Sequence, residues 1–173
     1  MKAFFPGTFD PFTNGHLDIV RRAARIFDRV VVGVYLESEK NVLFSPGERL
    51  QMIRESVESI ANVSAESYDG LTAKHAKNIG AGAIVRGLRA LSDFEHEFSL
   101  SSMNQSIEPD VETVCLLTSR EVAFISSSLI REVAALGQTV DHWVPSSVAS
   151  RIRAKLQLDT SPVSARGEVQ STS

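Results

Sequence analysis

Short apolar segments alternate with segments of helical periodicity along most of this chain, and this alternation is the feature that most constrains its fold. The apolar runs are rich in Val and Ile, which is typical of strands buried on both faces of a parallel sheet. Parallel strands need a long crossover between them, and that crossover is usually a helix. We therefore expect strands at residues 3–5, 30–35, 63–67, 83–85 and 111–117.

The segments between these runs have the spacing of amphipathic helices. Apolar residues recur at intervals of three and four from Leu17 to Phe27, with arginines on the opposite side. Ser-Pro-Gly-Glu at 45–48 is a capping box with proline at the first helical position, and Ser-Asp-Phe-Glu at 92–95 repeats the cap pattern. Together these signals predict an α/β fold, a Rossmann-like open doubly wound parallel five-stranded sheet with helices on both faces.

Length and composition limit the organisation of the chain. We expect one domain over residues 1–158, because 173 residues are enough to bury a sizeable core. The segment 159–173 is rich in Ser, Thr and Gln and poor in apolar residues, so we expect a disordered tail there. The apolar share of 43% and the charged share of 23% are those of a soluble globular protein.

Charge and cysteine content exclude several classes of protein. A net charge of −3 gives no indication of a nucleic-acid partner. No apolar run approaches the ~20 residues of a membrane span, and the N-terminus lacks a signal-peptide pattern. We therefore expect a cytoplasmic protein with no membrane partner. The single Cys115 excludes an internal disulfide, and its apolar neighbours predict a packed thiol.

The most unusual polar segment is Pro-Gly-Thr-Phe-Asp-Pro-Phe-Thr-Asn-Gly-His at 6–16, between the first strand and the first helix. Turns of this kind hold phosphates in α/β proteins. Gly15 permits close approach of a ligand to the backbone, and His16 adds a donor that can be charged near neutral pH. We interpret the segment as an anion site; the alternative is that His16 only caps the helix.

Other polar residues follow the other predicted strands. Arg86 and Arg89 come after the fourth strand, and two guanidinium groups can clamp phosphates. If the first and fourth strands are neighbours, both turns face one crevice. The serines at 126–128 stand at a predicted helix start, and Lys40 follows the second strand. Each of these also has an ordinary explanation: surface arginines, an N-cap, a surface lysine.

Several common motifs are missing. The chain has no P-loop, no strand-turn-helix dinucleotide fingerprint and no G-x-S-x-G hydrolase elbow. His75 and His96 have no metal-ligand spacing around them, so we expect no metal held by protein side chains.

In combination, these residues resemble a known family. Pro-Gly-Thr-Phe-Asp-Pro followed by Thr-x-Gly-His marks the nucleotidylyltransferase superfamily. Arg-Gly-Leu-Arg at 86–89, Asp-Phe-Glu at 93–95, Met-Asn at 103–104 and Ile-Ser-Ser-Ser at 125–128 make the chain similar to bacterial phosphopantetheine adenylyltransferases. The resemblance runs in order and spacing from residue 2 to about residue 156.

The resemblance implies a reaction of ATP with 4′-phosphopantetheine that gives dephospho-CoA and pyrophosphate, with Mg²⁺ bound mainly through the ATP phosphates. It implies a homohexamer and feedback inhibition by coenzyme A. His16 would stabilise the transition state. The substrate phosphopantetheine would be bound by Thr8, Lys40, Thr72 and Arg86. ATP would be bound by Thr8, Phe9, His16, Gly87, Leu88, Arg89, Glu97, Val122, Ala123, Phe124, Ile125, Ser126, Ser127 and Ser128.

Two other functions stay open on the residues alone. One is another small adenylyl- or cytidylyltransferase of the same fold, acting on nicotinate mononucleotide or glycerol phosphate. The other is a nucleotide-binding sensor without catalytic activity, which would need phosphate-binding turns but not the combination of His16 with Lys40.

Overall fold

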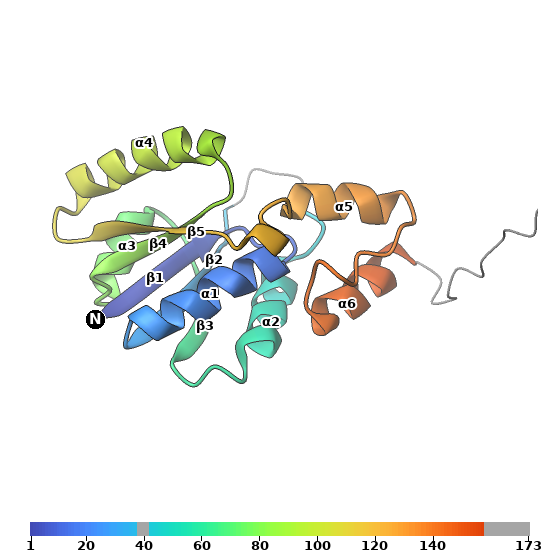
Figure 1. The fold of residues 1–173 in the computed structure, drawn as a ribbon. Coiled ribbons are helices and arrows are strands. Elements are labelled where there is room, and N and C mark those ends of the chain that lie inside the picture. Colours follow the sequence, from blue (N-terminus) through green and yellow to red (C-terminus); the bar gives the residue numbers. More distant parts are fainter. Residues whose placement is uncertain (38–41, 158–173) are drawn as a thin grey trace, which may run out of the picture.

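The computed structural model describes residues 1–37 and 42–157. Five strands form one parallel sheet in the order β3-β2-β1-β4-β5 (Figure 1). The order reverses beside β1, which pairs with β2 on one side and β4 on the other. This confirms the predicted doubly wound fold. The strands are β1 (Lys2–Gly7), β2 (Arg29–Tyr35), β3 (Val63–Tyr68), β4 (Ala83–Leu88) and β5 (Glu112–Leu117).

Helices cover both faces of the sheet (Figure 1). One layer contains α1 (Asn14–Ile26) and α2 (Pro46–Val57), extended by α5 (Ser127–Ala135) and α6 (Ser146–Leu156). The other contains α3 (Thr72–Asn78) and α4 (Leu91–Ile107). A short 3₁₀ turn, η1 (Arg120–Val122), precedes α5. None of the helices in the described ranges combines the length and apolar character needed to cross a bilayer.

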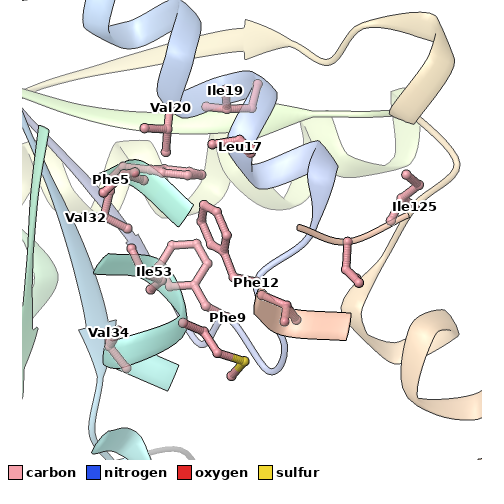
Figure 2. Close-up of a cluster of buried hydrophobic side chains, with 14 of the residues drawn as sticks. Phe5, Phe9, Phe12, Leu17, Ile19, Val20, Val32, Val34, Ile53 and Ile125 are labelled. Atoms are coloured by element: carbon pink, nitrogen blue, oxygen red, sulfur yellow. The ribbon is translucent and has the colours of Figure 1, made fainter. Parts of the chain in front are cut away.

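The side chains of β1 alternate between the two layers. Phe5 joins the core beneath α1 and α2, where it contacts Phe9 edge-on with ring centroids 5.4 Å apart (Figure 2). Phe4 points to the opposite face and meets Tyr68 edge-on at 5.1 Å. Both phenylalanines are buried, so the first strand is fixed between two cores at the centre of the sheet.

Three local predictions were wrong. β4 continues to Leu88, so Arg86 lies within the strand and not after it. The helix expected to be capped at Ser92 begins at Leu91 without a side-chain cap, because its N-cap residue is Ala90, whose side chain cannot accept a hydrogen bond. Cys115 is exposed and not packed, because it lies on β5, the edge strand, whose outer residues are only partly covered by the described chain.

Candidate active site

A cleft of about 510 Å³ lies where β1 and β4 end at the carboxyl edge of the sheet. The turn after β1 forms one wall, and the end of β4 with the first turns of α4 forms another. The start of α5 closes the site. The polar residues that line the cleft include Thr8, Asp10, Thr13, His16, Arg86, Arg89, Ser92, Asp93, His96, Glu97, Thr118, Ser126, Ser127, Ser128 and Arg131.

His16 is held in one orientation by the helix cap. Thr13 is the N-cap of α1, and its backbone N–H donates to His16 Nδ1 over 3.0 Å. The ring also packs against Phe9 and Phe12, with centroid distances of 5.0 Å and 5.5 Å. Because Nδ1 accepts a hydrogen bond, the proton of the neutral ring is on Nε2. His16 therefore presents a fixed N–H donor at the cleft.

The surroundings of His16 keep it neutral at physiological pH. Burial, together with the smaller effect of the positive charges of Arg89 and Arg86, lowers its pKa from 6.5 to about 4. The sequence suggested a histidine that is charged near neutral pH; the structure gives a neutral donor instead. A neutral imidazole N–H can strengthen its hydrogen bond as negative charge develops on a nearby oxygen.

This pKa predicts an acid-dependent loss of stability. The unfolded histidine takes up a proton below pH 6.5, whereas the folded one does so only near pH 4. The contribution of His16 to the unfolding free energy is therefore complete above pH 6.5 and decreases as the pH falls towards 4. Between pH 7 and pH 5 we expect the wild type to lose about 2 kcal/mol more unfolding free energy than His16→Gln, measured by urea denaturation. Parallel losses in the two proteins would contradict the lowered pKa.

Both cleft arginines are paired with carboxylates of α4. Arg86 Nε and Nη2 donate to Glu97 Oε2 and Oε1 over 2.6 Å and 2.7 Å, and Arg86 Nη1 donates to the Pro6 carbonyl over 3.0 Å. Arg89 Nε and Nη2 each donate to the Asp93 carboxylate over 3.1 Å. These contacts fix two planar cations at one side of the cleft.

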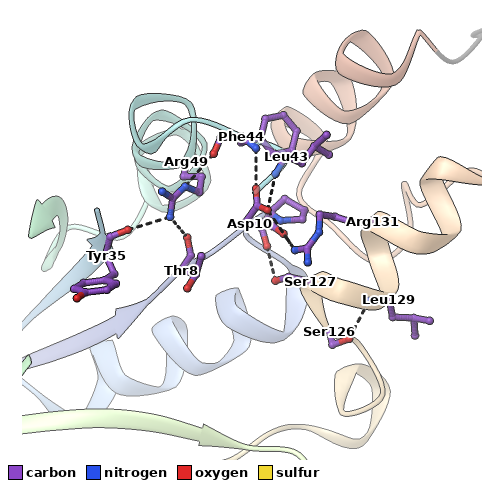
Figure 3. Close-up of polar contacts among 11 residues, drawn as sticks. Thr8, Asp10, Tyr35, Leu43, Phe44, Arg49, Ser126, Ser127, Leu129 and Arg131 are labelled. Carbon is purple, nitrogen blue, oxygen red and sulfur yellow. Dashed lines mark hydrogen bonds and ion pairs between the residues drawn. The ribbon is translucent and has the colours of Figure 1, made fainter. Parts of the chain in front are cut away.

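The N-terminus of α5 lies beside the turn that follows β1 (Figure 3). Ser126 is the N-cap and accepts the Leu129 N–H over 3.1 Å. Ser127 Oγ donates to the Pro11 carbonyl over 2.8 Å, which links the helix start to the turn. The first N–H groups of a helix have no intrahelical acceptor, so this helix end favours an anion.

Two buried charged residues, Asp10 and Arg49, stabilise the turn after β1 (Figure 3). Asp10 accepts the backbone N–H groups of Leu43 and Phe44 over 2.8 Å and 2.9 Å and forms an ion pair with Arg131 at 3.3 Å. Arg49, which is 1% exposed, donates to the Thr8 carbonyl over 2.7 Å. It also donates to the carbonyls that end β2 and precede α2. The turn is thus tied to two neighbouring segments.

Most residues singled out in the sequence converge on this cleft. Thr8, Phe9, His16, Arg86, Gly87, Arg89, Glu97, Ile125 and the three serines line it. Leu88, Val122, Ala123 and Phe124 adjoin these residues in the chain but do not line it. Thr72 lies two strands away from β1, at the start of α3, where its hydroxyl is 3.1 Å from that of Tyr68. Lys40 falls outside the described residues.

Several polar residues of the cleft were not predicted as site residues: Asp10, Thr13, Ser92, Asp93, His96, Thr118 and Arg131. Asp10 and Thr13 lie inside the segment 6–16 and were passed over there. Arg131 follows Ser127 by four residues, and this spacing on one helix face could have indicated it. His96 carries no comparable signal, because its neighbours in the chain read as a helix surface.

The carboxylates of the cleft are engaged by arginines. Asp10, Asp93 and Glu97 are each within ion-pair distance of an arginine. Across residues 1–37 and 42–157, no three His, Cys, Asp or Glu side chains are grouped as a metal site would require. The donor set of the cleft, dominated by guanidinium, imidazole, hydroxyl and backbone N–H groups, suits phosphate groups.

The fold and the cleft define the class of protein. A parallel sheet whose strand order reverses beside a phosphate-type turn is the architecture of nucleotide-binding α/β proteins. Residues 4–133 match the sequence model of the cytidylyltransferase-like family. A crystal structure assigned to a nicotinate-nucleotide adenylyltransferase of Vibrio parahaemolyticus has the same fold, with a TM-score of 0.67 over 92% of this chain and 96% of that chain. At 19% identity this likeness extends to the fold alone.

Closer sequence relatives narrow the class. A phosphopantetheine adenylyltransferase of Thermomicrobium roseum is 48% identical over 90% of this chain and 95% of its own length. One of Moorella thermoacetica is 52% identical over 84% of this chain and 91% of its own length. The chain belongs to the phosphopantetheine adenylyltransferase family, within the cytidylyltransferase-like proteins.

Proposed function

We propose that this protein transfers the adenylyl group of ATP to 4′-phosphopantetheine, releasing pyrophosphate and forming dephospho-CoA for coenzyme A synthesis. One observation carries the proposal: the neutral His16 donor, two fixed arginines and the start of α5 line the same cleft. The substrates are those indicated by the names of the relatives.

The reaction needs alignment and charge neutralisation more than proton transfer. A phosphate monoester has a second pKa near ~6, so the phosphopantetheine phosphate is mostly a dianion at neutral pH. One of its oxygens attacks the α-phosphorus of ATP, and the bond from that phosphorus to the bridging oxygen of the β-phosphate breaks. His16 Nε2–H donates to an α-phosphate oxygen, where negative charge changes in the transition state. No general base is required.

The proposed contacts divide between the two substrates. Thr8 orients the attacking phosphate by a hydrogen bond, and Arg86 and Lys40 neutralise it. The pantetheine arm extends along the sheet edge towards Thr72. Arg89 and the start of α5 bind the ATP phosphates, aided by backbone groups of Phe9. The remaining ATP contacts of the proposal are Gly87, Leu88, Val122, Ala123, Phe124, Ile125, Ser126, Ser127 and Ser128.

Mg²⁺ would enter with ATP. The cleft carboxylates are already paired with arginines, so the phosphate oxygens are the hard ligands that this ion prefers. When bound there, the ion would neutralise part of the triphosphate charge. We also propose that the protein acts in the cytoplasm and that coenzyme A, which contains the product skeleton, inhibits by occupying the same cleft.

The test of function compares acceptors. Purified protein is mixed with ATP, MgCl₂ and, in separate reactions, 4′-phosphopantetheine, nicotinate mononucleotide or glycerol 3-phosphate, and pyrophosphate release is followed. Of the three acceptors, we expect only phosphopantetheine to give pyrophosphate release. The rate of that release should fall when coenzyme A is added. Release with another acceptor would indicate a different transferase. Nucleotide binding without release would indicate a sensor.

Arg86 provides a prediction specific to the acceptor. We expect Arg86→Gln to raise KM for phosphopantetheine about tenfold or more, because a charge-assisted contact to the phosphate is lost. Initial rates at saturating ATP measure this. Arg25→Gln, at an exposed position near the end of α1, is the matched control and should leave KM unchanged. An unchanged KM for Arg86→Gln would show that phosphopantetheine does not bind at Arg86.

We propose that the protein assembles as a homohexamer. Leu91, Phe94 and Phe98 on α4 are 84%, 50% and 63% exposed, and an apolar stripe of this kind is typical of a protein interface. We expect Phe98→Asp to reduce the mass measured by analytical ultracentrifugation, because a buried carboxylate without a partner destabilises an interface. Ile26→Asp, at an exposed apolar residue that ends α1, should keep the wild-type mass. An unchanged mass for Phe98→Asp would exclude this face.

A further inference from the structure

We infer that helix α4 positions both cleft arginines, with Asp93 holding Arg89 and Glu97 holding Arg86. Asp93 and Glu97 are then positioning residues, which act on the reaction through the arginines. The inference deepens the proposed function and rests on it. The family resemblance implies that Glu97 contacts ATP directly; in this inference Glu97 instead positions Arg86. The inference also adds Asp93 to the residues of the site.

The contact between Glu97 and Arg86 has the geometry of a two-point clamp. Each carboxylate oxygen accepts one N–H, at 2.6 Å and 2.7 Å, so both oxygens are already engaged with the guanidinium. Glu97 is 8% exposed and is the buried residue of α4, which is otherwise largely exposed along its described length. A carboxylate buried in this way is stable only while its cation remains opposite.

Asp93 holds Arg89 at three points. Its Oδ2 accepts the Arg89 backbone N–H over 2.9 Å and Nε–H over 3.1 Å, and its Oδ1 accepts from Nη2 over 3.1 Å. Partial burial opposes ionisation, but the hydrogen bonds from Arg89 outweigh it and hold the pKa of Asp93 below its ordinary value. The carboxylate therefore stays charged, and both the backbone and the side chain of Arg89 are fixed.

The arrangement leaves the arginines able to bind phosphate. A guanidinium carries five N–H groups. Within the described residues, Arg86 uses three of them on Glu97 and Pro6, and Arg89 uses two on Asp93. The others remain for a ligand. An arginine that is already ordered loses less side-chain entropy when phosphate binds.

The spacing of the two carboxylates makes α4 a single positioning element. Asp93 and Glu97 are four residues apart, so they lie one turn apart on the same face of the helix. The arginines that they hold come from the end of β4 and the residue after it. One helix thereby sets the direction of two cations that the strand alone would leave free to rotate.

A sign test separates positioning from a simple charge effect. Removing a negative charge from the cleft should strengthen ATP binding if the charge alone matters, because ATP is an anion. Removing a positioning group should weaken it. We expect Asp93→Asn to weaken ATP binding about tenfold, measured by calorimetry with the full chain. Glu95→Gln is the matched control, because Glu95 is an exposed carboxylate on the same helix and should leave the affinity unchanged.

A double-mutant cycle completes the test. If Asp93 acts through Arg89, Asp93→Asn should have no effect on the ATP Kd in an Arg89→Ala background. An equal loss in both backgrounds, or tighter binding by Asp93→Asn, would overturn the inference. The parallel cycle of Glu97→Gln with Arg86→Gln is read in KM for phosphopantetheine. Since the first cycle needs only ATP binding, it stays decisive even if the protein proves inactive with phosphopantetheine, a result that would refute the proposed function alone.

Discussion

Replacing His16 by Ala is expected to lower kcat by about 10²–10³-fold while changing the ATP dissociation constant by less than about threefold. The Nε2–H is fixed by the Thr13 N–H on the other ring nitrogen and by the surrounding phenylalanine rings. A donor held in this way contributes most when charge changes on the α-phosphate, so the loss falls on the transition state. Single-turnover rates with saturating substrates, together with calorimetric ATP binding, separate the two quantities.

A second histidine serves as the control for this prediction. His142 is exposed and does not line the cleft, so His142→Ala should keep the wild-type kcat. A His16→Ala variant with near-normal turnover would remove the central catalytic role from the proposed mechanism. Equal losses in kcat and in ATP affinity would instead identify His16 as a ground-state binding residue.

Gly33→Ala is expected to lower the unfolding free energy by about 3 kcal/mol. Gly33 lies in β2 beside the buried Phe4 ring, and a Cβ there would come within 2.3 Å of that ring. Phe4 has little room to move, because Tyr68 packs against it edge-on at 5.1 Å. Phe4 and Gly33 lie on the paired central strands β1 and β2, so the clash displaces these strands. Chemical denaturation monitored by circular dichroism measures the change.

Gly47 provides the opposite expectation for the same substitution. It stands in the first turn of α2, where an added Cβ meets no atom within 4 Å. Gly47→Ala should therefore raise the unfolding free energy by about 0.5 kcal/mol, because alanine favours a helix and restricts the unfolded chain. If Gly33→Ala stays within about 0.5 kcal/mol of the wild type, the packing around Phe4 is looser than described.

The fold could be predicted from the sequence to a large extent because local patterns agree with the tertiary arrangement. The capping box at Ser45 forms as predicted. Ser45 Oγ accepts a hydrogen bond from the Glu48 N–H, and the Glu48 carboxylate accepts one from the Ser45 N–H. The cap expected at Ser92 does not form because the helix begins one residue earlier, at Leu91, and the N-cap position falls on Ala90. A capping pattern therefore predicts the cap only where the helix begins at the same residue.

The candidate site was predictable in its members but not in its electrostatics. The turn at 6–16 and the end of β4 were recognisable from glycine, histidine and arginine at strand ends. The pairing of Arg86 with Glu97 and the neutral state of His16 were not. Both depend on which side chains meet across elements and on how much water they exclude, and neither property leaves a local pattern in the sequence.

By itself, the sequence determined the alternation of strands and helices, the parallel sheet and most of the predicted residues that line the cleft, because strand and helix periodicities and turn residues are local properties. Only the tertiary structure decided that β1 and β4 are neighbours, that α4 holds the cleft arginines and that His16 keeps its proton on Nε2. The physical reason is that strand order, ion pairing and desolvation arise from contacts between residues far apart in the chain, which come into existence when the sheet closes on its two helical layers.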